Sequence, residues 1–576
     1  MPLADPAPDL PRAAPVAVCV VDAGVALAWA GGARAVATSE PTSVVHALAA
    51  HDPRWVWWSA RECAALVGDA VRPRTCWDLA AVAGLASGLR RTDAGAVWAA
   101  AHDLDLPVAP GAALDLFDLE GEGGGPVRDD GQLSREWLHS VWRADLETAT
   151  RWAELALEVH DAQERTIAEI PDPRAAPGPT PLAMLVARSE SAAALLCAEL
   201  EHDGLPFDRD VAAALLTPAI GPPPRDPDEE VAERARRDDE VLRHFPGGAA
   251  YDLRNPAQVR ELLQRIGIDV PDTRSGRLTP YAASSPGVAA LLQWRKAERL
   301  ATTYGWRWMD ECVGADGRLR GAWGSYDGGA GRMTASSGLH NLPAELRPAV
   351  RAEPGYVLVR ADLGQIEPRV LAAVSGDEAL AHAAQSTDLY APVAAQLGCE
   401  RATAKVAVLS AMYGGTAGSA AAALRDMDRA YPRAMAFLRE AEDAGRRGVP
   451  IRTWGGRLLR LDHGADISGY DDVEPDALRR AAGYGRFARN AVIQGAAAEL
   501  FKAWAATVRD ALANDARIVL CLHDELVLHV PAAAVDATRD LLVSALAATA
   551  RWWCAGSAVQ LIAEVTHGES WADAHG

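Results

Sequence analysis

Lysine is the residue type that this chain almost lacks. Of its 57 basic residues only Lys296, Lys405 and Lys502 are lysines, and the others are arginines. Alanine, glycine and proline are abundant at the same time. We interpret this bias as that of a genome rich in G and C, not as a functional choice.

Closely spaced cysteines, long apolar runs and a leader are missing as well. The eight cysteines include no Cys-x-x-Cys pair, which argues against a zinc site and favours reduced thiols. No apolar run is long enough to cross a bilayer, and residues 1–6 lack the charged and apolar regions of a signal peptide. We therefore expect a cytoplasmic protein that does not bind membranes.

Positive charge is in deficit overall but not everywhere. The net charge is −21, which argues against a general nucleic-acid coat, because phosphate affinity comes from clustered Lys and Arg. Between Cys399 and Ala505, however, 16 Lys and Arg stand against 13 Asp and Glu. A local basic groove is therefore compatible with the acidic total.

The length of 576 residues suggests three or four domains. Residues 15–110 alternate short β-rich runs, at 16–21 and 55–58, with helical stretches, which is an α/β pattern. A helix is predicted over 134–170, and the proline-rich residues 171–179 after it are predicted to be a linker. A mainly helical block follows to about residue 312, and no internal repeat is present.

The most informative stretch surrounds Asp362. The apolar run 356–359 predicts a strand, and residues 365–374 have the apolar spacing of a helix. Asp362 therefore lies where a strand gives way to a helix, and Glu367 faces the same cleft, a suitable place to hold a metal ion. Taken alone, Asp362 is more simply explained as a helix cap.

A second acidic segment favours the interpretation of Asp362 as a metal ligand over that of a helix cap. In residues 519–531 two apolar β runs flank His523, Asp524 and Glu525, which predicts a hairpin with these three residues at its turn. An acidic hairpin tip is usually just solvated, but here the flanking strands are buried, and burying charge without a partner is costly. Asp362 and Asp524 together would hold two Mg²⁺ ions roughly 3.5–4 Å apart, as nucleotidyl transfer requires.

Two helices supply candidate binding groups. Positions 401, 405, 409 and 413 form one helical stripe about 18 Å long, in which Arg401 and Lys405 would grip phosphates, Leu409 would touch a sugar and Tyr413 a base. The alternative is a helix with a solvated cationic edge. On the second helix, positions 486, 490 and 494 share a face, and the side chains there suit minor-groove acceptors and primer phosphates: Arg486, Asn490 and Gln494.

These segments resemble motifs A, B and C of family A DNA polymerases, the DNA polymerase I type, in the family's order and with similar separations. The motifs are Asp-Leu-Gly-Gln-Ile-Glu-Pro-Arg, Arg-x3-Lys-x7-Tyr-Gly and His-Asp-Glu-Leu-Val. The likeness extends to residues 332–343, to the C-terminal 568–575, and to thumb-like segments near 201–208, 255–262 and 294–300. It covers roughly residues 180–576.

The resemblance implies a template-directed DNA polymerase that adds dNMP from dNTP to a primer 3′-hydroxyl with two Mg²⁺ ions. Asp362, Asp524 and the Leu363 carbonyl would be the metal ligands, and Glu525 would support them. Lys405 would also protonate the leaving pyrophosphate, and Glu367 would be the steric gate against a ribose 2′-hydroxyl. The implied nucleotide-binding set is Glu367, Arg401, Lys405, Leu409, Tyr413 and Gln365. The implied DNA-binding set is Arg332, Arg486, Asn490, Gln494 and His523.

The implied architecture is a multidomain protein of α/β and α+β parts. A degenerate RNase H-like 3′–5′ exonuclease domain (1–170) and a linker (171–180) precede a right-hand polymerase. Its parts would be the thumb (181–330), the palm (331–376 and 484–576) and the fingers (377–483). We expect a bacterial, nucleoid-associated monomer that acts on primer–template DNA in repair or replication.

The chain departs from the family's pattern at a few positions. Leu409 and Leu363 replace aromatic residues, Pro368 follows the gate residue, and Tyr390 stands where the family has a phosphate-contacting His. In the N-terminal region Asp22 has no acidic partner, Arg61 or Glu62 falls at the second exonuclease site, and Asp145 remains at the third. We therefore predict that proofreading is absent.

Two other functions compete with that of a polymerase. A catalytically weak relative could hold DNA or act as a repair scaffold, and primer extension would separate it from a working enzyme. A phosphotransferase for small substrates would leave Arg486, Asn490 and Gln494 without a role.

Overall fold

The computed structural model describes residues 5–68, 72–108, 125–248, 251–326, 330–414, 419–461, 475–513 and 515–575. The chain forms two compact units, each built from separate segments. Unit 1 comprises Met1–Asp203, Ala322–Thr334 and Val359–Thr566. Unit 2 comprises Gly204–Gly321, Ala335–Leu358 and His567–Gly576.

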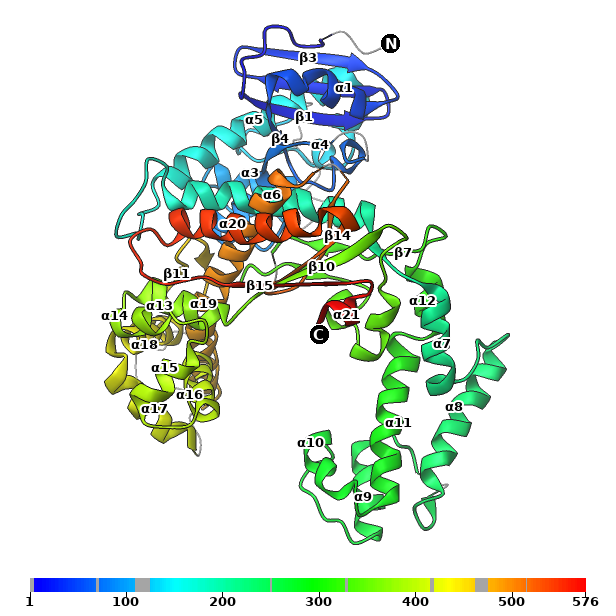
Figure 1. Cartoon of the computed structure of the whole chain (residues 1–576). Helices are drawn as coiled ribbons and strands as arrows, with labels where there is room; N and C mark the ends of the chain where they lie inside the picture. Colours follow the sequence, from blue (N-terminus) through cyan, green and yellow to red (C-terminus); the bar gives the residue numbers. More distant parts are fainter. Residues whose placement is uncertain are drawn as a thin grey trace. The chain divides into compact units, whose positions relative to one another are not determined.

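The N-terminal part of unit 1 is a five-stranded sheet (Figure 1). Its strands are β1 (Pro15–Val21), β2 (Gly24–Trp29), β3 (Gly32–Ala37), β4 (Arg54–Trp57) and β5 (Thr75–Asp78), in the order β3-β2-β1-β4-β5. The first three strands are antiparallel, whereas β4 runs parallel to β1 and β5 parallel to β4. The two β runs predicted from sequence, 16–21 and 55–58, are thus confirmed as β1 and β4. Helices α1 (Pro41–Leu48), α2 (Leu79–Ser87) and α3 (Ala94–Ala101) complete the α/β pattern.

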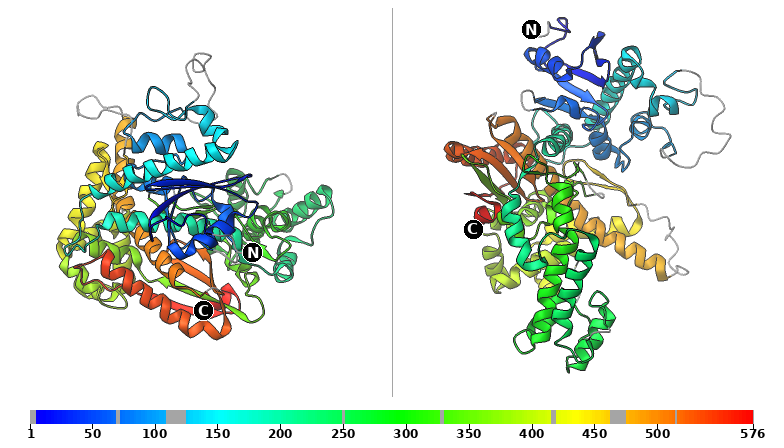
Figure 2. Two further views of the ribbon diagram at one scale, coloured as in Figure 1. Left: turned by 90° about the horizontal axis from the view of Figure 1, so that it is seen from above. Right: turned by 90° about the vertical axis from the view of Figure 1, so that its right-hand side faces the viewer.

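The single helix predicted over 134–170 is wrong. The structure has α4 (Arg135–His139), a 3₁₀ turn at Val141–Arg143 and then α5 (Leu146–Ala168), which packs against β1, β2 and β3 (Figure 2). The break comes from local capping, because Asp145 accepts a hydrogen bond from the Thr148 N–H at 2.8 Å and the Thr148 hydroxyl lies near the Asp145 N–H. Such a capping box starts a new helix rather than continuing the old one.

The proline-rich segment after α5 is irregular, as predicted, but it is anchored. The Arg174 side chain is only 1% exposed. Its guanidinium donates to Asp172 and to the carbonyl oxygens of Trp552 and Thr180, each at 2.6–2.8 Å. This buried arginine therefore ties the segment to the C-terminal part of unit 1.

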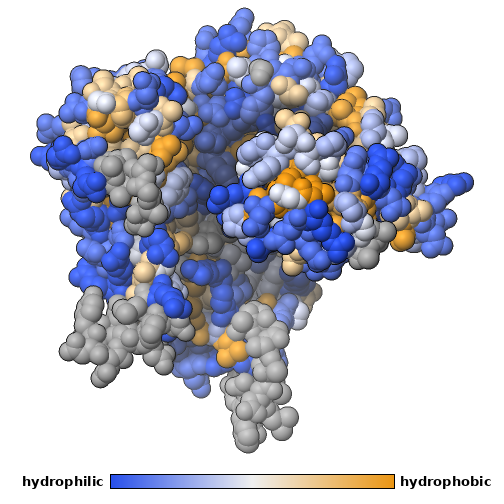
Figure 3. Space-filling view, turned by 90° about the horizontal axis from the view of Figure 1, so that it is seen from below, coloured by the Kyte–Doolittle hydropathy of each residue, from blue (hydrophilic) through white to orange (hydrophobic). Residues whose placement is uncertain are grey.

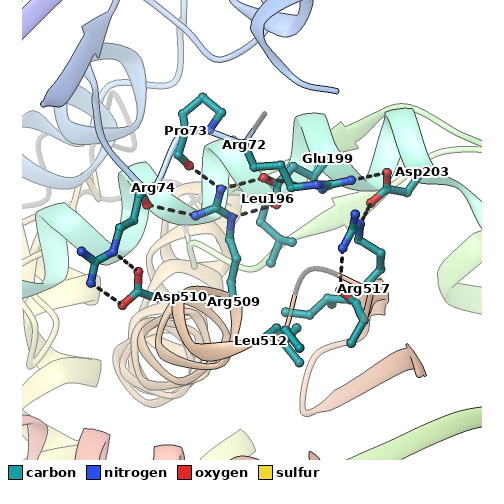
Figure 4. A pocket seen from close by; sticks show the side chains of 13 residues that line it. Arg72, Pro73, Arg74, Leu196, Glu199, Asp203, Arg509, Asp510, Leu512 and Arg517 are labelled. Carbon is teal, nitrogen blue, oxygen red and sulfur yellow. Dashed lines mark hydrogen bonds and ion pairs between the residues drawn. The ribbon is translucent and has the colours of Figure 1, made fainter. Parts of the chain in front are cut away.

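Helix α6 (Leu182–Asp203) joins the two halves of unit 1. Ala194 and Leu195 belong to the hydrophobic core beneath the N-terminal sheet, while the helix also packs along α19 (Pro475–Ala511). Charged residues reinforce this contact around a cavity of about 240 Å³ (Figure 4). There Glu199 of α6 accepts from Arg509 of α19 at 2.6 and 2.8 Å, and Arg74 pairs with Asp510 at 2.8 Å.

A second buried ionic group links the same two helices. Lys502 of α19 donates to Glu190 of α6 at 2.5 Å, and Arg457 forms an ion pair with the same carboxylate at 2.6 Å. Lys502 is 1% exposed and Glu190 is fully buried. Each of these buried charges is therefore stabilised by the other and by Arg457.

The C-terminal part of unit 1 is built on a four-stranded sheet in the order β13-β14-β10-β15. The strands are β13 (Arg517–Cys521), β14 (Glu525–Pro531), β10 (Tyr356–Leu363) and β15 (Ala563–Gly568). Helices α19 and α20 (Val535–Trp553) pack on each other, and α20 packs on β14. The remaining helices form a bundle: α13 (Ile366–Ser375), α14 (Glu378–Ala383), α15 (Tyr390–Leu397), α16 (Arg401–Tyr413), α17 (Ser419–Ala430) and α18 (Pro432–Arg447).

Unit 2 is mainly helical, as the sequence predicted for this block. Its helices are α7 (Arg209–Ile220), α8 (Pro227–Leu242), α9 (Pro256–Arg265), α10 (Ser275–Leu278), α11 (Pro286–Thr303), α12 (Trp306–Cys312) and α21 (Trp571–His575). Leu263, Leu278, Val288 and Leu291 lie in its core with no exposed surface. Arg254 crosses between helices, because it donates to Asp238 of α8 and Glu298 of α11 at 2.7 Å each.

The surface is predominantly polar on the face shown in Figure 3, where hydrophobic residues form small separate groups. None of the helices that the structure describes is long and apolar enough to cross a lipid bilayer.

Candidate active site

The sheet of unit 1 brings Asp362 and Asp524 onto neighbouring segments. β10 continues through Leu363, so Asp362 is the penultimate residue of the strand, not a helix cap. Asp524 lies in the turn between β13 and β14, which confirms the predicted hairpin. The Leu363 N–H donates to the Asp524 carbonyl oxygen at 2.8 Å, and this bond fixes the two segments side by side.

The carboxylates of this site are crowded. Burial raises the pKa of Asp362 to about 6, and the nearby carboxylate of Asp524 adds to the shift. Burial also raises the pKa of Asp524, with a further contribution from Glu525. Each anion is thus destabilised by low solvation and by like charge, and a divalent cation would relieve both. Carboxylate oxygens are the ligands that Mg²⁺ prefers, so these residues fit a magnesium site.

Glu525 and Arg360 complete the acidic centre. Glu525, the first residue of β14, is 97% buried. Arg360 on β10 donates to both Glu525 and Asp362 at 2.7 Å. The sequence had singled out Glu525 but not Arg360, because the pattern of a strand does not show which charges meet across it.

Glu367 lies in the first turn of α13 and is held by two partners. Arg332 donates to its Oε1 at 2.6 Å, and the Tyr413 hydroxyl donates to its Oε2 at 2.7 Å. Burial and this bond raise the pKa of Tyr413 to about 12, so the hydroxyl remains a donor. Pro368 fits because the first residues of a helix have no N–H bond to lose. These hydrogen bonds bring together Arg332, Glu367 and Tyr413, which the sequence predicted separately as site residues.

Helix α16 has the bounds that the sequence predicted. Arg401 at its start is exposed and donates to Asp388 at 2.6 Å, and its guanidinium lies 5.7 Å from the Tyr390 ring centre. Lys405 is exposed, Leu409 is half-buried and Tyr413 is exposed, so the four lie along one accessible edge.

Gln365 takes a left-handed conformation, with φ of 57°, between β10 and α13. Its side-chain amide donates to Asp388 at 2.7 Å and accepts from the Leu389 N–H at 2.8 Å. It thereby connects the end of β10 to the residue that holds Arg401. In the structure, the side chain of this predicted nucleotide-binding residue therefore helps to hold Asp388, the partner of Arg401, in place.

The predicted DNA-binding face lies on α19. Arg486 is exposed, Asn490 and Gln494 are half-buried, and His523 is exposed in the β13–β14 turn. The end of α16 lies next to this face, because a Cβ on Gly414 would stand 3.5 Å from Arg486.

Two buried arginines that support the site were not assigned roles from the sequence. Arg369 of α13 is 1% exposed and donates to the carbonyl oxygens of five residues, at 2.8–3.0 Å. These five are Gly364, Ala384, Ser386, Thr387 and Gln560. Arg489 of α19 donates to the Ala411 carbonyl oxygen at 2.6 Å and to Glu442 at 2.9 Å, which joins α16, α18 and α19. An arginine in a helical pattern gives no sign of carbonyl partners so distant in sequence.

The residues at the family's exonuclease positions in the N-terminal region lie on separate elements. Asp22 is exposed in the β1–β2 turn, Arg61 and Glu62 are exposed, and Asp145 is the exposed cap of α5. Across the described part of the chain, no group of three or more His, Cys, Asp or Glu is arranged to hold a metal ion, so the candidate active site offers a pair of carboxylates, Asp362 and Asp524, and not a cluster of three.

Comparison with known proteins agrees with this geometry. The model of "DNA polymerase family A" matches residues 229–573. DNA polymerase I of Chloroflexus aurantiacus is 30% identical over 339 residues, which is 51% of this chain and 35% of the relative. The thermostable DNA polymerase I of Thermus aquaticus is 29% identical over 385 residues, 60% of this chain and 44% of the relative. The chain thus spans less than half the length of the curated relatives it matches.

A solved structure resembles almost the whole chain. The POL domain of Pol1 from M. smegmatis, in complex with DNA primer-template and dNTP, superposes with a TM-score of 0.66 at 22% identity. The match covers 97% of this chain and 96% of the other. This likeness confirms the predicted fold class, including its N-terminal α/β part.

Proposed function

The chain belongs to DNA polymerase family A, and on that premise we propose that it is a template-directed DNA polymerase. It would transfer dNMP from dNTP to the 3′-hydroxyl of a primer. The observation that carries the proposal is the convergence of Asp362 on β10 and Asp524 in the β13–β14 turn, joined by the hydrogen bond from the Leu363 N–H to the Asp524 carbonyl oxygen. The Arg332–Glu367–Tyr413 group adds a second set of polar side chains suited to a nucleotide.

Asp362 and Asp524, with the Leu363 carbonyl, would hold two Mg²⁺ ions. When bound, these ions would lower the pKa of the primer hydroxyl and neutralise the triphosphate. Glu525 supports the acidic centre from its buried position on β14.

The chain's own side chains would position the nucleotide. Arg401 and Lys405 lie exposed on α16, where cationic groups suit the triphosphate. Lys405 would also deliver a proton to the leaving pyrophosphate, because an ammonium group loses a proton far more readily than a guanidinium group. Glu367, fixed by its two partners, would exclude a ribose 2′-hydroxyl by its bulk. Gln365, Leu409 and Tyr413 complete the proposed nucleotide site.

The DNA would lie along α19. Arg332, Arg486, Asn490, Gln494 and His523 are the proposed contacts to primer and template. We assign the thumb to residues 181–330, the fingers to 377–483 and the palm to 331–376 and 484–576. Within this proposal the protein acts as a monomer associated with the bacterial nucleoid, in repair or replication.

Proofreading is absent in this proposal. The residues at the three family positions in the N-terminal region are exposed and lie on separate elements, and Asp145 is engaged as a helix cap. A domain of this kind would serve as a structural support for α6 and α19.

Primer extension separates this function from the alternative of a catalytically weak DNA-binding relative. With Mg²⁺ and dNTPs, wild type should extend a primer, and Asp524→Ala should lose about 10³-fold or more in rate, as expected when a charge-stabilising group is removed. Asp540→Ala, an exposed carboxylate on α20, is the matched control and should behave as wild type. Wild-type extension no faster than that of Asp524→Ala, with DNA still bound, would favour the binding function.

A further inference from the structure

Arg360 places one guanidinium between two carboxylates of the candidate active site. Its Nε donates to Glu525 Oε2 and its Nη2 donates to Asp362 Oδ2, both at 2.7 Å. The Arg360 side chain is 11% exposed and that of Glu525 is 4% exposed. Because water reaches Arg360 and Glu525 poorly, their contact is screened far less than that of a surface ion pair, whereas Asp362 is 27% exposed and reaches solvent.

The strand geometry explains this arrangement. Arg360 and Asp362 are two residues apart on β10, so their side chains lie on the same face of the sheet. Val359 and Ala361 point to the opposite face and are fully buried. β14 is the neighbour of β10, and Glu525 at its start comes within reach of the same guanidinium.

Arginine is suited to this position in a way that lysine is not. Its planar guanidinium carries several donors in fixed directions, so one side chain binds two carboxylates at once. Its charge is also permanent over the physiological pH range. The acidic centre therefore always has a cation in direct contact with Asp362.

We propose that Arg360 is a positioning residue that holds Asp362 and Glu525 in place and weakens the affinity of the free protein for divalent cations. This inference rests on the proposed function, in which Asp362 is a metal ligand. One carboxylate oxygen of Asp362 is already bonded to Arg360, and a second positive charge entering nearby is repelled. The negative charge of a triphosphate offsets this repulsion, so divalent cations bind firmly only together with the nucleotide.

A direct test measures Mn²⁺ binding to the full chain without DNA or nucleotide, by electron paramagnetic resonance. Arg360→Met removes the charge at similar side-chain length and should bind Mn²⁺ at least about tenfold more tightly than wild type. Arg360→Lys keeps the charge and should stay within about threefold of wild type. Unchanged, weaker or undetectable Mn²⁺ binding by folded Arg360→Met would overturn the proposal, because a purely structural arginine predicts one of these results.

A second pair of variants keeps the test decisive if Arg360→Met does not fold. Arg360→Met/Glu525→Gln removes both members of the buried pair, which is tolerated better than removing one. It should bind Mn²⁺ more tightly than Glu525→Gln alone, and equal affinities would contradict the proposal. Primer extension by wild type is measured in parallel. If wild type does not extend, the proposed function fails while the Mn²⁺ comparison still decides the role of Arg360.

Discussion

Among single residues, Glu367 is the side chain on which sugar selection depends in the proposed function. Its two oxygens are engaged by Arg332 and Tyr413, which come from separate segments of unit 1. Both partners are donors, so the carboxylate is held in one orientation. Bulk at a fixed position is what a steric gate requires.

Replacing this side chain should separate bulk from charge. Glu367→Ala should raise the incorporation of ribonucleotides relative to deoxyribonucleotides by about tenfold or more, because the space for a 2′-hydroxyl opens. Glu367→Gln keeps the size and should change the ratio little. The measurement is kcat/KM for each nucleotide with each variant. A ratio in Glu367→Gln as high as that in Glu367→Ala would assign the selection to the hydrogen bonds instead.

The residues of the candidate active site were predictable from the sequence to different extents. Asp362 and Asp524 followed from charged positions at the ends of apolar β runs, a local pattern. Leu409 and Tyr413 followed from helical spacing. Arg360 and Arg369 did not, because their partners lie on other segments, and only the folded chain shows that five carbonyl oxygens surround Arg369.

At the scale of elements, α6 and α19 depend on each other through buried charges. Glu199 is 4% exposed and pairs with Arg509, which is 10% exposed (Figure 4). Burial alone would lower the pKa of Arg509, yet its pKa is raised, because the contact with Glu199 outweighs the loss of hydration. Both helices therefore lose stability if the carboxylate is removed.

Glu199→Ala should destabilise unit 1 by about 3 kcal/mol, since removing one partner leaves a buried guanidinium uncompensated. Urea unfolding followed by tryptophan fluorescence measures the effect. Glu154→Ala is the matched control in the same unit: it breaks a pair with Arg151 on α5 in which the side chains are 42% and 47% exposed, and the unfolding midpoint should not move. Equal midpoints for Glu199→Ala and wild type would show that the α6–α19 contact rests on packing alone.

Elements with strong local signals were predicted well, and capping explains the exception. Helix α16 was predicted from Arg401 to Tyr413 because no Gly or Pro interrupts it. The helix expected over 134–170 divides because Asp145 and Thr148 form a capping box, a signal that competes with helical periodicity. Capping residues thus deserve the same weight as apolar spacing in a sequence such as this one.

At the scale of the whole molecule, the proposed absence of proofreading concerns the N-terminal region. Wild type should not trim a mismatched primer 3′ end with Mg²⁺ or Mn²⁺, and Asp145→Ala should be no different. Release of 3′ mononucleotides from a labelled primer, without dNTPs, measures this directly. Metal-dependent trimming by wild type that Asp145→Ala abolishes would show that the domain retains a nuclease site.

The motifs predicted the family, whereas the grouping of the chain in space needed the structure. The sequence suggested consecutive domains with a boundary near residue 180. In the structure α6 packs with both the N-terminal sheet and α19, so the compact unit combines the first 203 residues with distant segments. Contacts such as Arg509–Glu199 join positions 310 apart in sequence, and no local pattern encodes them.

The scarcity of lysine makes the molecule convenient for distance measurements. Lys502 is buried beneath Glu190, whereas Lys296 on α11 and Lys405 on α16 are exposed. Besides the α-amino group at the N-terminus, amine-reactive fluorophores would therefore attach to one side chain in unit 2 and one in unit 1. Energy transfer between the two dyes would report how the separation of the units changes when DNA is added.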